Sequence, residues 1–313
     1  MPTPTTNTMN PIARAVNANL TAIGDSNDRP AWLAARRNII GSSEVPALLG
    51  LSRFSTPAKL LAVKLGLVNE DAKISDAALW GNRLERFILD DFRTETERHV
   101  EHNTVTFRAN GLAVPLASTP DGFQAGEGLN GSGTCQVKVT WRSERWRDDV
   151  PADVWAQCQY EMYTVNMDWS SAMYLRPGGS VYWKDLPYDD GFINQTMPLV
   201  ETFWECVRGF KTLPQSMIDG KPMTTKALDL LFPEAPESRI ELDGEWLDMR
   251  WEIESLKEQI DKLTTLRNEL RNKVRAKMAT ATIGAMSDGS EFTLKTTTRG
   301  DRQLRIRKGK NNA

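Results

Sequence analysis

Two side chains that could support phosphodiester hydrolysis stand one residue apart in the segment "GSGTCQVKVTW", residues 131–141. The segment alternates apolar and polar residues, which predicts a half-buried strand with Gln136 and Lys138 on one face. Cutting a phosphodiester needs a water nucleophile, a divalent cation that lowers the pKa of that water, and positive charge beside the phosphate. The Lys138 ammonium could hold the attacking water or stabilise charge on the phosphate.

Oxygen ligands for a magnesium ion can be named nearby. Mg²⁺ prefers octahedral oxygen ligation and usually takes only a few ligands from the protein. The candidates are Asp121 in "STPDG", the side-chain oxygen of Gln136 and the backbone carbonyl of Val137, and Glu85 on a preceding helical segment could complete the site. Each has an ordinary structural explanation, since Asp before Gly is usually a turn residue and lone charged residues usually lie at the surface. Their order and spacing together favour a site.

The surrounding segments predict a mixed α/β (α+β) domain of about 200 residues, and the family resemblance given below implies a mixed central sheet flanked by helices. Helices are expected over 11–40, 76–96, 151–166 and 192–214, strands and turns over 97–140, and a hairpin over 170–188. We expect a flexible N-terminus over 1–28, a core over 29–215 and a Pro-rich linker over 216–242. Residues 243–313 are expected to form an appendage of a long heptad helix, a small β-hairpin and a basic tail.

Composition excludes several classes of protein. The three cysteines form no CxxC pair and His99 and His102 are the only histidines, so a zinc site lacks ligands at suitable spacing. No run approaches 18 apolar residues, which argues against a membrane span, and we expect a cytoplasmic protein. The net charge of −2 argues against a generally basic surface but leaves room for a local basic groove.

Six segments resemble, in order, the PD-(D/E)XK nuclease superfamily and, within it, the lambda-exonuclease / YqaJ-type viral recombinase family. The resemblance covers about residues 30–212. The segments are "RRNIIGSSEVPALLGLSRFSTP", "GNRLE", "TPDGF", "CQVKVT", "VPADVWAQCQYEMYTVN" and "FWECVRGFKTLP". The resemblance implies a restriction-endonuclease-like core and a Mg²⁺ cofactor for which Mn²⁺ can substitute.

The resemblance also implies roles for the candidate residues. Asp121 would be the central metal ligand and Gln136 the second ligand, with Lys138 as the catalytic lysine. Glu85 would serve a second metal or its waters. Gln157 would line the site and orient water or phosphate, whereas Gln159 points elsewhere on the helix and is expected to be structural.

Arg36 and Ser43 match the family positions that hold the 5′ phosphate of the strand being digested. A guanidinium fork and a hydroxyl at a helix start suit a terminal phosphate. The ordinary alternatives are a surface arginine and a helix N-cap serine. Glu44, beside them, would repel DNA and is expected to pair with Arg36, Arg37 or Arg53 instead.

The chain departs from the family at position 136, where the family has Glu. Gln keeps the shape and one oxygen but removes a negative charge on which magnesium affinity depends. Three explanations stay open: a natural variant whose missing charge comes from Glu85, a deliberate replacement that blocks cutting, or lost catalysis with DNA-end binding retained.

The resemblance implies a phage or prophage exonuclease, a hydrolase of DNA recombination in a bacterial host cell. It would degrade the 5′-ended strand of linear double-stranded DNA and leave 3′ single strands for a single-strand annealing protein. A homotrimer is also implied. Two alternatives are an endonuclease on the same core and a catalytically silent module that binds DNA ends or a partner.

Overall fold

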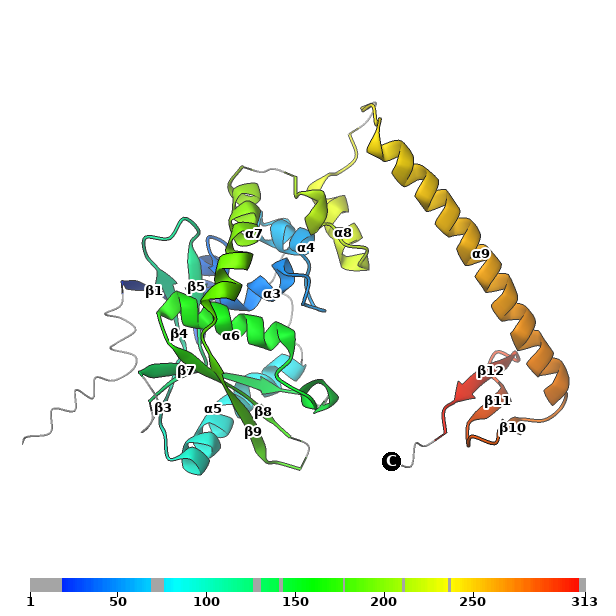
Figure 1. Ribbon diagram of the computed structural model, residues 1–313, viewed down its shortest axis with the longest axis horizontal. Coiled ribbons are helices and arrows are strands. Elements are labelled where there is room, and N and C mark those ends of the chain that lie inside the picture. Colours follow the sequence, from blue (N-terminus) through cyan, green and yellow to red (C-terminus); the bar gives the residue numbers. More distant parts are fainter. Residues whose placement is uncertain are drawn as a thin grey trace, which may run out of the picture. The chain divides into compact units, whose positions relative to one another are not determined.

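The computed structural model describes residues 19–68, 76–125, 131–140, 143–176, 178–209, 212–235 and 238–309. It divides into two compact units, residues 1–234 and 235–313, drawn in Figure 1. Within the described ranges, no helix combines the length and the apolar composition that crossing a bilayer requires.

A five-stranded mixed sheet forms the centre of the first unit (Figure 1). In spatial order its strands are β3 (His99–His102), β6 (Gly122–Ala125), β7 (Ser132–Val139), β8 (Trp169–Leu175) and β9 (Val181–Pro187). Strands β7 and β8 run parallel and the other neighbours antiparallel. The predicted fold class, a mixed sheet flanked by helices, is confirmed.

The side chains on the two faces of β7 contact two different helices. They are α5 (Asp76–Thr96) and α6 (Ala152–Val165). Cys135 and Val137 pack against the apolar side of α5, which includes Ile88 and Phe92. Gln136 faces the other way and accepts a hydrogen bond from a side chain of α6. The period-two alternation of a strand therefore separates the hydrophobic core from the polar residues.

A second, four-stranded sheet corrects our expectation for the N-terminal region. In spatial order its strands are β1 (Leu20–Asp25), β4 (Val105–Ala109), β5 (Leu116–Ser118) and β2 (Ile40–Gly41). Residues 20–25 are thus neither helical nor a flexible tail, because they pair antiparallel with β4. A register shift between Ala22 and Gly24 breaks the alternation that would have indicated a strand. Residues 1–18 lie outside the described ranges.

The remaining helices of the first unit are α2 (Arg29–Arg36), η1 (Ser42–Glu44), α3 (Val45–Leu48), α4 (Pro57–Lys64), η2 (Ser143–Trp146), α7 (Asp190–Gly209), η3 (Gln215–Met217) and α8 (Pro222–Leu231). The expected linker 216–242 therefore contains a helix. Ala227 of α8 is buried against Ala58 and Ala62 of α4. The Pro-rich composition obscured this helix, although proline at the first helical position favours a helix start.

The second unit contains the predicted heptad helix, α9 (Glu245–Met278), and a three-stranded antiparallel sheet. The strands are β10 (Ile283–Ala285), β11 (Glu291–Thr296) and β12 (Arg302–Arg307). Met278 of α9 packs with Leu294 and Leu304 of the sheet. The expected hairpin thus has a third strand, and much of the expected basic tail forms β12, paired with β11.

Candidate functional site

One cavity of about 650 Å³ in the first unit brings together every residue that the sequence assigned to the site. Its lining includes Arg36, Ser43, Glu85, Asp121, Gln136, Val137, Lys138 and Gln157. These residues come from α2, η1, α5, the approach to β6, strand β7 and helix α6. The phosphate-binding pair and the metal and lysine group, predicted from separate motifs, therefore share one space.

Asp121 is fixed against β7 by its backbone and its carboxylate. Its backbone N–H donates to the Cys135 carbonyl at 3.0 Å, and its Oδ2 accepts from the Val137 N–H at 2.6 Å. The next residue, Gly122, cannot be replaced easily, because an added Cβ would lie 2.9 Å from the Glu101 carbonyl oxygen of β3. The Asp-Gly pair therefore marks a close approach of two strands instead of the turn that its composition suggests.

A chain of amide hydrogen bonds orients the polar face of β7. The Lys138 ammonium donates to Gln157 Oε1 at 3.0 Å, so the Gln157 nitrogen points the other way. That nitrogen donates to Gln136 Oε1 at 2.6 Å, and Gln136 Nε2 in turn donates to Asp121 Oδ2 at 2.5 Å and to the Val137 carbonyl at 3.3 Å. Gln136 therefore turns its nitrogen toward Asp121, whereas a metal ligand would turn its oxygen.

Glu161 is a site residue that sequence reasoning missed. It is fully buried, lines the cavity and accepts a hydrogen bond at Oε1 from Gln157 Nε2 at 2.8 Å. Its Oε2 is buried and has no hydrogen-bond partner among the described residues. A carboxylate within the buried stretch "QYEMY", four residues after Gln157, was the available signal, because residues i and i+4 share a helix face.

Two carboxyl groups of the cavity, those of Asp121 and Glu161, lie in an environment that disfavours their charge. Burial, followed by the charge of Glu85, raises the pKa of Asp121 to about 7. Burial, followed by the charge of Asp121, raises the pKa of Glu161 to about 8. Glu85 has a partner, His102 Nε2 at 2.9 Å, and that hydrogen bond raises the pKa of His102. His102 also lines the cavity and was not predicted as a site residue.

The predicted phosphate-binding pair is held by a buried carboxylate. Arg36 Nη2 lies 2.8 Å from Glu44 Oε1 and 3.4 Å from Ser43 Oγ. Glu44 Oε2 also contacts Lys64 Nζ at 2.7 Å and accepts from the Gly41 N–H at 2.9 Å. Burial raises the pKa of Glu44, but Arg36 and Lys64 outweigh it and hold the pKa below its usual range. The expected pairing of Glu44 with Arg36 is confirmed.

Ser43 and Trp32 complete this end of the cavity. Ser43 is exposed and lies inside η1, whose N-cap is Gly41, so it is not the helix cap that the ordinary alternative required. The Arg36 guanidinium lies 4.5 Å from the centre of the Trp32 ring. The buried indole N–H of Trp32 has no acceptor among the described residues. Gln159, by contrast, bonds the backbone of Pro187 and Asp189, which is a structural role.

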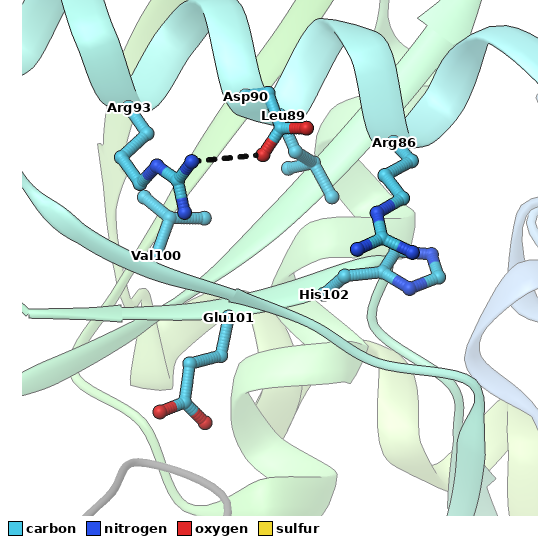
Figure 2. A pocket seen from close by; sticks show the side chains of 7 residues that line it. All are labelled: Arg86, Leu89, Asp90, Arg93, Val100, Glu101 and His102. Atoms are coloured by element: carbon cyan, nitrogen blue, oxygen red, sulfur yellow. Dashed lines mark ion pairs between the residues drawn. The ribbon is translucent and has the colours of Figure 1, made fainter.

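A smaller cavity of about 450 Å³ lies between α5 and β3 (Figure 2). Figure 2 shows Arg86, Asp90 and Arg93 on the helix opposite His102 of the strand, while Glu101 points away from the helix. Arg93 pairs with Asp90 at 3.2 Å and Glu101 with His99 at 3.0 Å. Because Asp90 is paired with Arg93 and the Glu101 side chain points away from the helix, few carboxylates converge here, and this cavity is a weaker candidate for metal chemistry.

The donor set of the large cavity fits a hard divalent cation. No three Asp, Glu, His or Cys side chains converge into a closed metal cage within the described ranges. Mg²⁺ does not need such a cage, because it is commonly bound by one or two carboxylates and retains several waters. A cation would relieve the repulsion between Asp121 and Glu161 and would supply a partner for the Glu161 Oε2 atom.

The chain is similar to one family of known proteins. Residues 31–168 match the family of the YqaJ-like viral recombinase domain. This confirms the resemblance for the first five sequence segments, and every candidate site residue lies within the matched range. The sixth segment, residues 203–214, lies beyond it. The uncharacterized protein YqaJ of Bacillus subtilis (strain 168) is 25% identical over 272 residues, which are 85% of this chain and 83% of that protein.

Solved structures show a more distant likeness. The alkaline exonuclease LHK-Exo from Laribacter hongkongensis is 18% identical, with 58% of this chain and 93% of that chain covered and a TM-score of 0.47. A phage-related exonuclease from Haemophilus somnus 129PT is 10% identical, with 56% and 96% covered and a TM-score of 0.41. Because both TM-scores lie below 0.5, the likeness alone does not establish a common fold.

Proposed function

We propose that this chain is a metal-dependent exonuclease that acts on the ends of linear double-stranded DNA. It degrades the 5′-ended strand and leaves a 3′ single strand for annealing. The observation that carries the proposal is the single cavity in which Arg36 and Ser43 face the same space as Asp121, Lys138 and Gln157. Phosphate recognition and phosphodiester hydrolysis can therefore act on one end of one strand.

The cation end of the cavity would hold Mg²⁺ or Mn²⁺. Asp121, the Val137 carbonyl and Glu85 would hold the ion, as would Gln136 Oε1 after rotation of its amide. When bound, such an ion supplies the Lewis acid that lowers the pKa of an attacking water. Lys138, oriented by Gln157 at 3.0 Å, places its ammonium beside the reacting phosphate and donates hydrogen bonds to the water or the developing charge.

The other end would bind the terminal phosphate. Arg36 is already oriented by Glu44, so little side-chain entropy is lost when a phosphate binds. The Ser43 hydroxyl is exposed toward the same space and can donate a second hydrogen bond. This arrangement favours a strand that begins with a 5′ phosphate. The family resemblance further supports a homotrimer and a single-strand annealing protein as partner.

Digestion of matched DNA substrates tests the proposal. Linear duplex with a 5′ phosphate should be degraded in Mg²⁺ or Mn²⁺, the same duplex with a 5′ hydroxyl should be degraded more slowly, and covalently closed circles should stay intact. Cleavage of the circles would contradict an end-dependent exonuclease and favour the endonuclease alternative.

A catalytically silent DNA-end-binding module is the second candidate. One observation favours it: the Gln136 amide nitrogen lies within hydrogen-bond range of both Asp121 Oδ2 and the Val137 carbonyl, the two oxygens expected to hold the cation. End binding without digestion in either metal would support this candidate.

A further inference from the structure

Glu161 has an oxygen atom without a partner in the part of the chain that the structure describes. Its side chain is fully buried and lines the large cavity, yet no hydrogen bond from the described residues to Oε2 meets distance and angle limits. The nearby Ser42 side chain lowers the pKa of Glu161, but its hydroxyl donates to Ser118 Oγ at 3.2 Å. Buried polar groups are nearly always hydrogen-bonded, because an unpaired one loses its hydration without compensation. The Lys138 ammonium does not provide the partner, since its hydrogen bond goes to Gln157 Oε1. Glu161 is therefore placed to receive a ligand.

Glu161 lies close to Gln136, the position on β7 where the family has a charged Glu. Gln157 Nε2 donates both to Gln136 Oε1 at 2.6 Å and to Glu161 Oε1 at 2.8 Å, so both oxygens lie within hydrogen-bond distance of one nitrogen. Helix α6 thus brings a carboxylate beside the side chain that is neutral in this sequence. Glu85, the other carboxylate considered for this task, is engaged by His102.

We propose that Glu161 is a further carboxylate ligand of the divalent cation, beside Asp121, and replaces the carboxylate that position 136 lacks. The inference rests on the proposed function, because it assigns a ligand to the cation of that reaction. Asp121, just before β6, and Glu161, on α6, hold the ion. Gln136 donates a hydrogen bond to Asp121 and Gln157 donates one to Glu161, so these two amides position the carboxylates.

The ligand chemistry points to a hard cation. Carboxylate and carbonyl oxygens suit Mg²⁺ or Mn²⁺, and two carboxylates with bound waters are a common set for Mg²⁺. A cation also removes the mutual repulsion of two buried carboxylates, which a neutral ligand or an anion would not. A site with Gln136 and Glu161 as ligands then has the same number of carboxylates beside Asp121 as a site with Glu at position 136.

Calorimetric titration of the purified protein with MnCl₂ tests this assignment without relying on activity. Glu161→Gln should weaken Mn²⁺ binding by about tenfold or more, and the exchanged pair Gln136→Glu/Glu161→Gln should restore it. The matched control is Asp153→Asn, which removes a carboxylate from the same helix but from a side chain that pairs with Arg145 at 2.6 Å and does not line the cavity. It should bind Mn²⁺ like the parent protein.

The outcomes separate this inference from the proposed function. If the parent protein binds Mn²⁺ and digests linear DNA while Glu161→Gln binds Mn²⁺ equally well, the inference is wrong and the proposed function stands. If the parent binds no Mn²⁺ and digests nothing, both are wrong. Should Glu161→Gln fail to fold, Glu161→Asp decides: a ligand shortened by one methylene weakens Mn²⁺ binding, and unchanged affinity overturns the assignment.

Discussion

Two buried glutamates of the first unit, Glu44 and Glu161, differ in how their charge is compensated. Glu44 contacts Arg36 at 2.8 Å and Lys64 at 2.7 Å, and its pKa is lowered although burial raises it. Glu161 has one amide donor and one unpartnered oxygen, and its pKa is raised to about 8. The first carboxylate belongs to a completed ion-pair network, whereas the second belongs to a site that lacks a positive charge.

The difference teaches that the two halves of the site are prepared differently. At the proposed phosphate-binding pair, Glu44 already orients the Arg36 guanidinium through a contact of 2.8 Å. At the proposed cation site, the carboxylates of Asp121 and Glu161 lack a paired positive charge among the described residues. A divalent ion would compensate their charges, as Arg36 and Lys64 compensate the charge of Glu44. Each of the following experiments disturbs one half and leaves the other as its reference.

The largest effect is expected at Lys138. Lys138→Ala should lower the rate of DNA digestion by on the order of 10²–10³-fold, since it removes the positive charge at the developing phosphate charge. Lys184→Ala is the matched control, because Lys184 pairs with Asp149 and does not line the cavity. Digestion rates on end-labelled duplex measure both, and equal loss in the two variants would contradict the role of Lys138.

Removing the charge of Glu44 from its ion pairs with Arg36 and Lys64 should lower the free energy of unfolding. Glu44→Gln leaves Arg36 and the buried Lys64 short of a counter-charge, so the free energy of unfolding should fall by roughly 3–5 kcal/mol. Asp90→Asn removes the exposed pair with Arg93 and should cost less than about 1 kcal/mol. Chemical denaturation compares the two, and a small loss in Glu44→Gln would show that the network is not as tightly coupled as its geometry indicates.

The buried Glu161 carboxyl group should make the stability of the metal-free protein fall at alkaline pH. The pKa of Glu161 rises from 4.5 to about 8 on folding, so the folded state holds a proton that the unfolded state has lost. Stability therefore falls as pH rises from about 4.5 through 8, by roughly 3–5 kcal/mol if Glu161 acts alone. Melting temperatures in EDTA at pH 6 and pH 9 measure this. Glu161→Gln should flatten the dependence, and an unchanged slope would contradict the assigned burial.

The phosphate end should control the choice of DNA end. Arg36→Ala should lower the preference for a 5′ phosphate over a 5′ hydroxyl by about tenfold, the effect of one or two charge-assisted hydrogen bonds. Arg37→Ala, an exposed arginine outside the cavity lining, is the control. Competition between the two ends gives the ratio, and the account is wrong on this point if Arg36→Ala keeps the preference.

The smallest effect is expected from Gln136→Glu. It adds a carboxylate where Glu161 already supplies one, so Mg²⁺-dependent digestion should rise only severalfold. A very large gain would mean that Glu161 does not compensate. No change at all would mean that position 136 does not reach the metal.

Much of the site could be predicted from local sequence. The spacing of Gln136 and Lys138 on one strand face is a consequence of strand geometry, and the motifs that carry Asp121, Gln157 and Arg36 retain their order along the chain. The role of Glu161 could not be predicted, because it depends on which face of α6 covers β7. The orientation of the Gln136 amide likewise follows from hydrogen bonds to residues 15 and 21 positions away.

Some elements of the fold could be predicted from local sequence patterns, whereas others depend on contacts between distant parts of the chain. The regular helix α6 and the hairpin β8–β9 have periodic patterns and were found, whereas β1 and α8 were not. Strand β1 is formed by pairing with β4, whose partner residues lie 80 or more positions further along the chain. Helix α8 is held by the contact of Ala227 with α4, and neither contact leaves a local signature.

Digestion of a linear duplex labelled on either end of one strand tests the central claim most directly. With a 5′ phosphate and Mg²⁺, the 5′ label should be released early as short product while the 3′ label stays on long fragments, and EDTA should stop both. Bound but undigested DNA in Mg²⁺ and Mn²⁺, or release of the 3′ label first, would contradict the account.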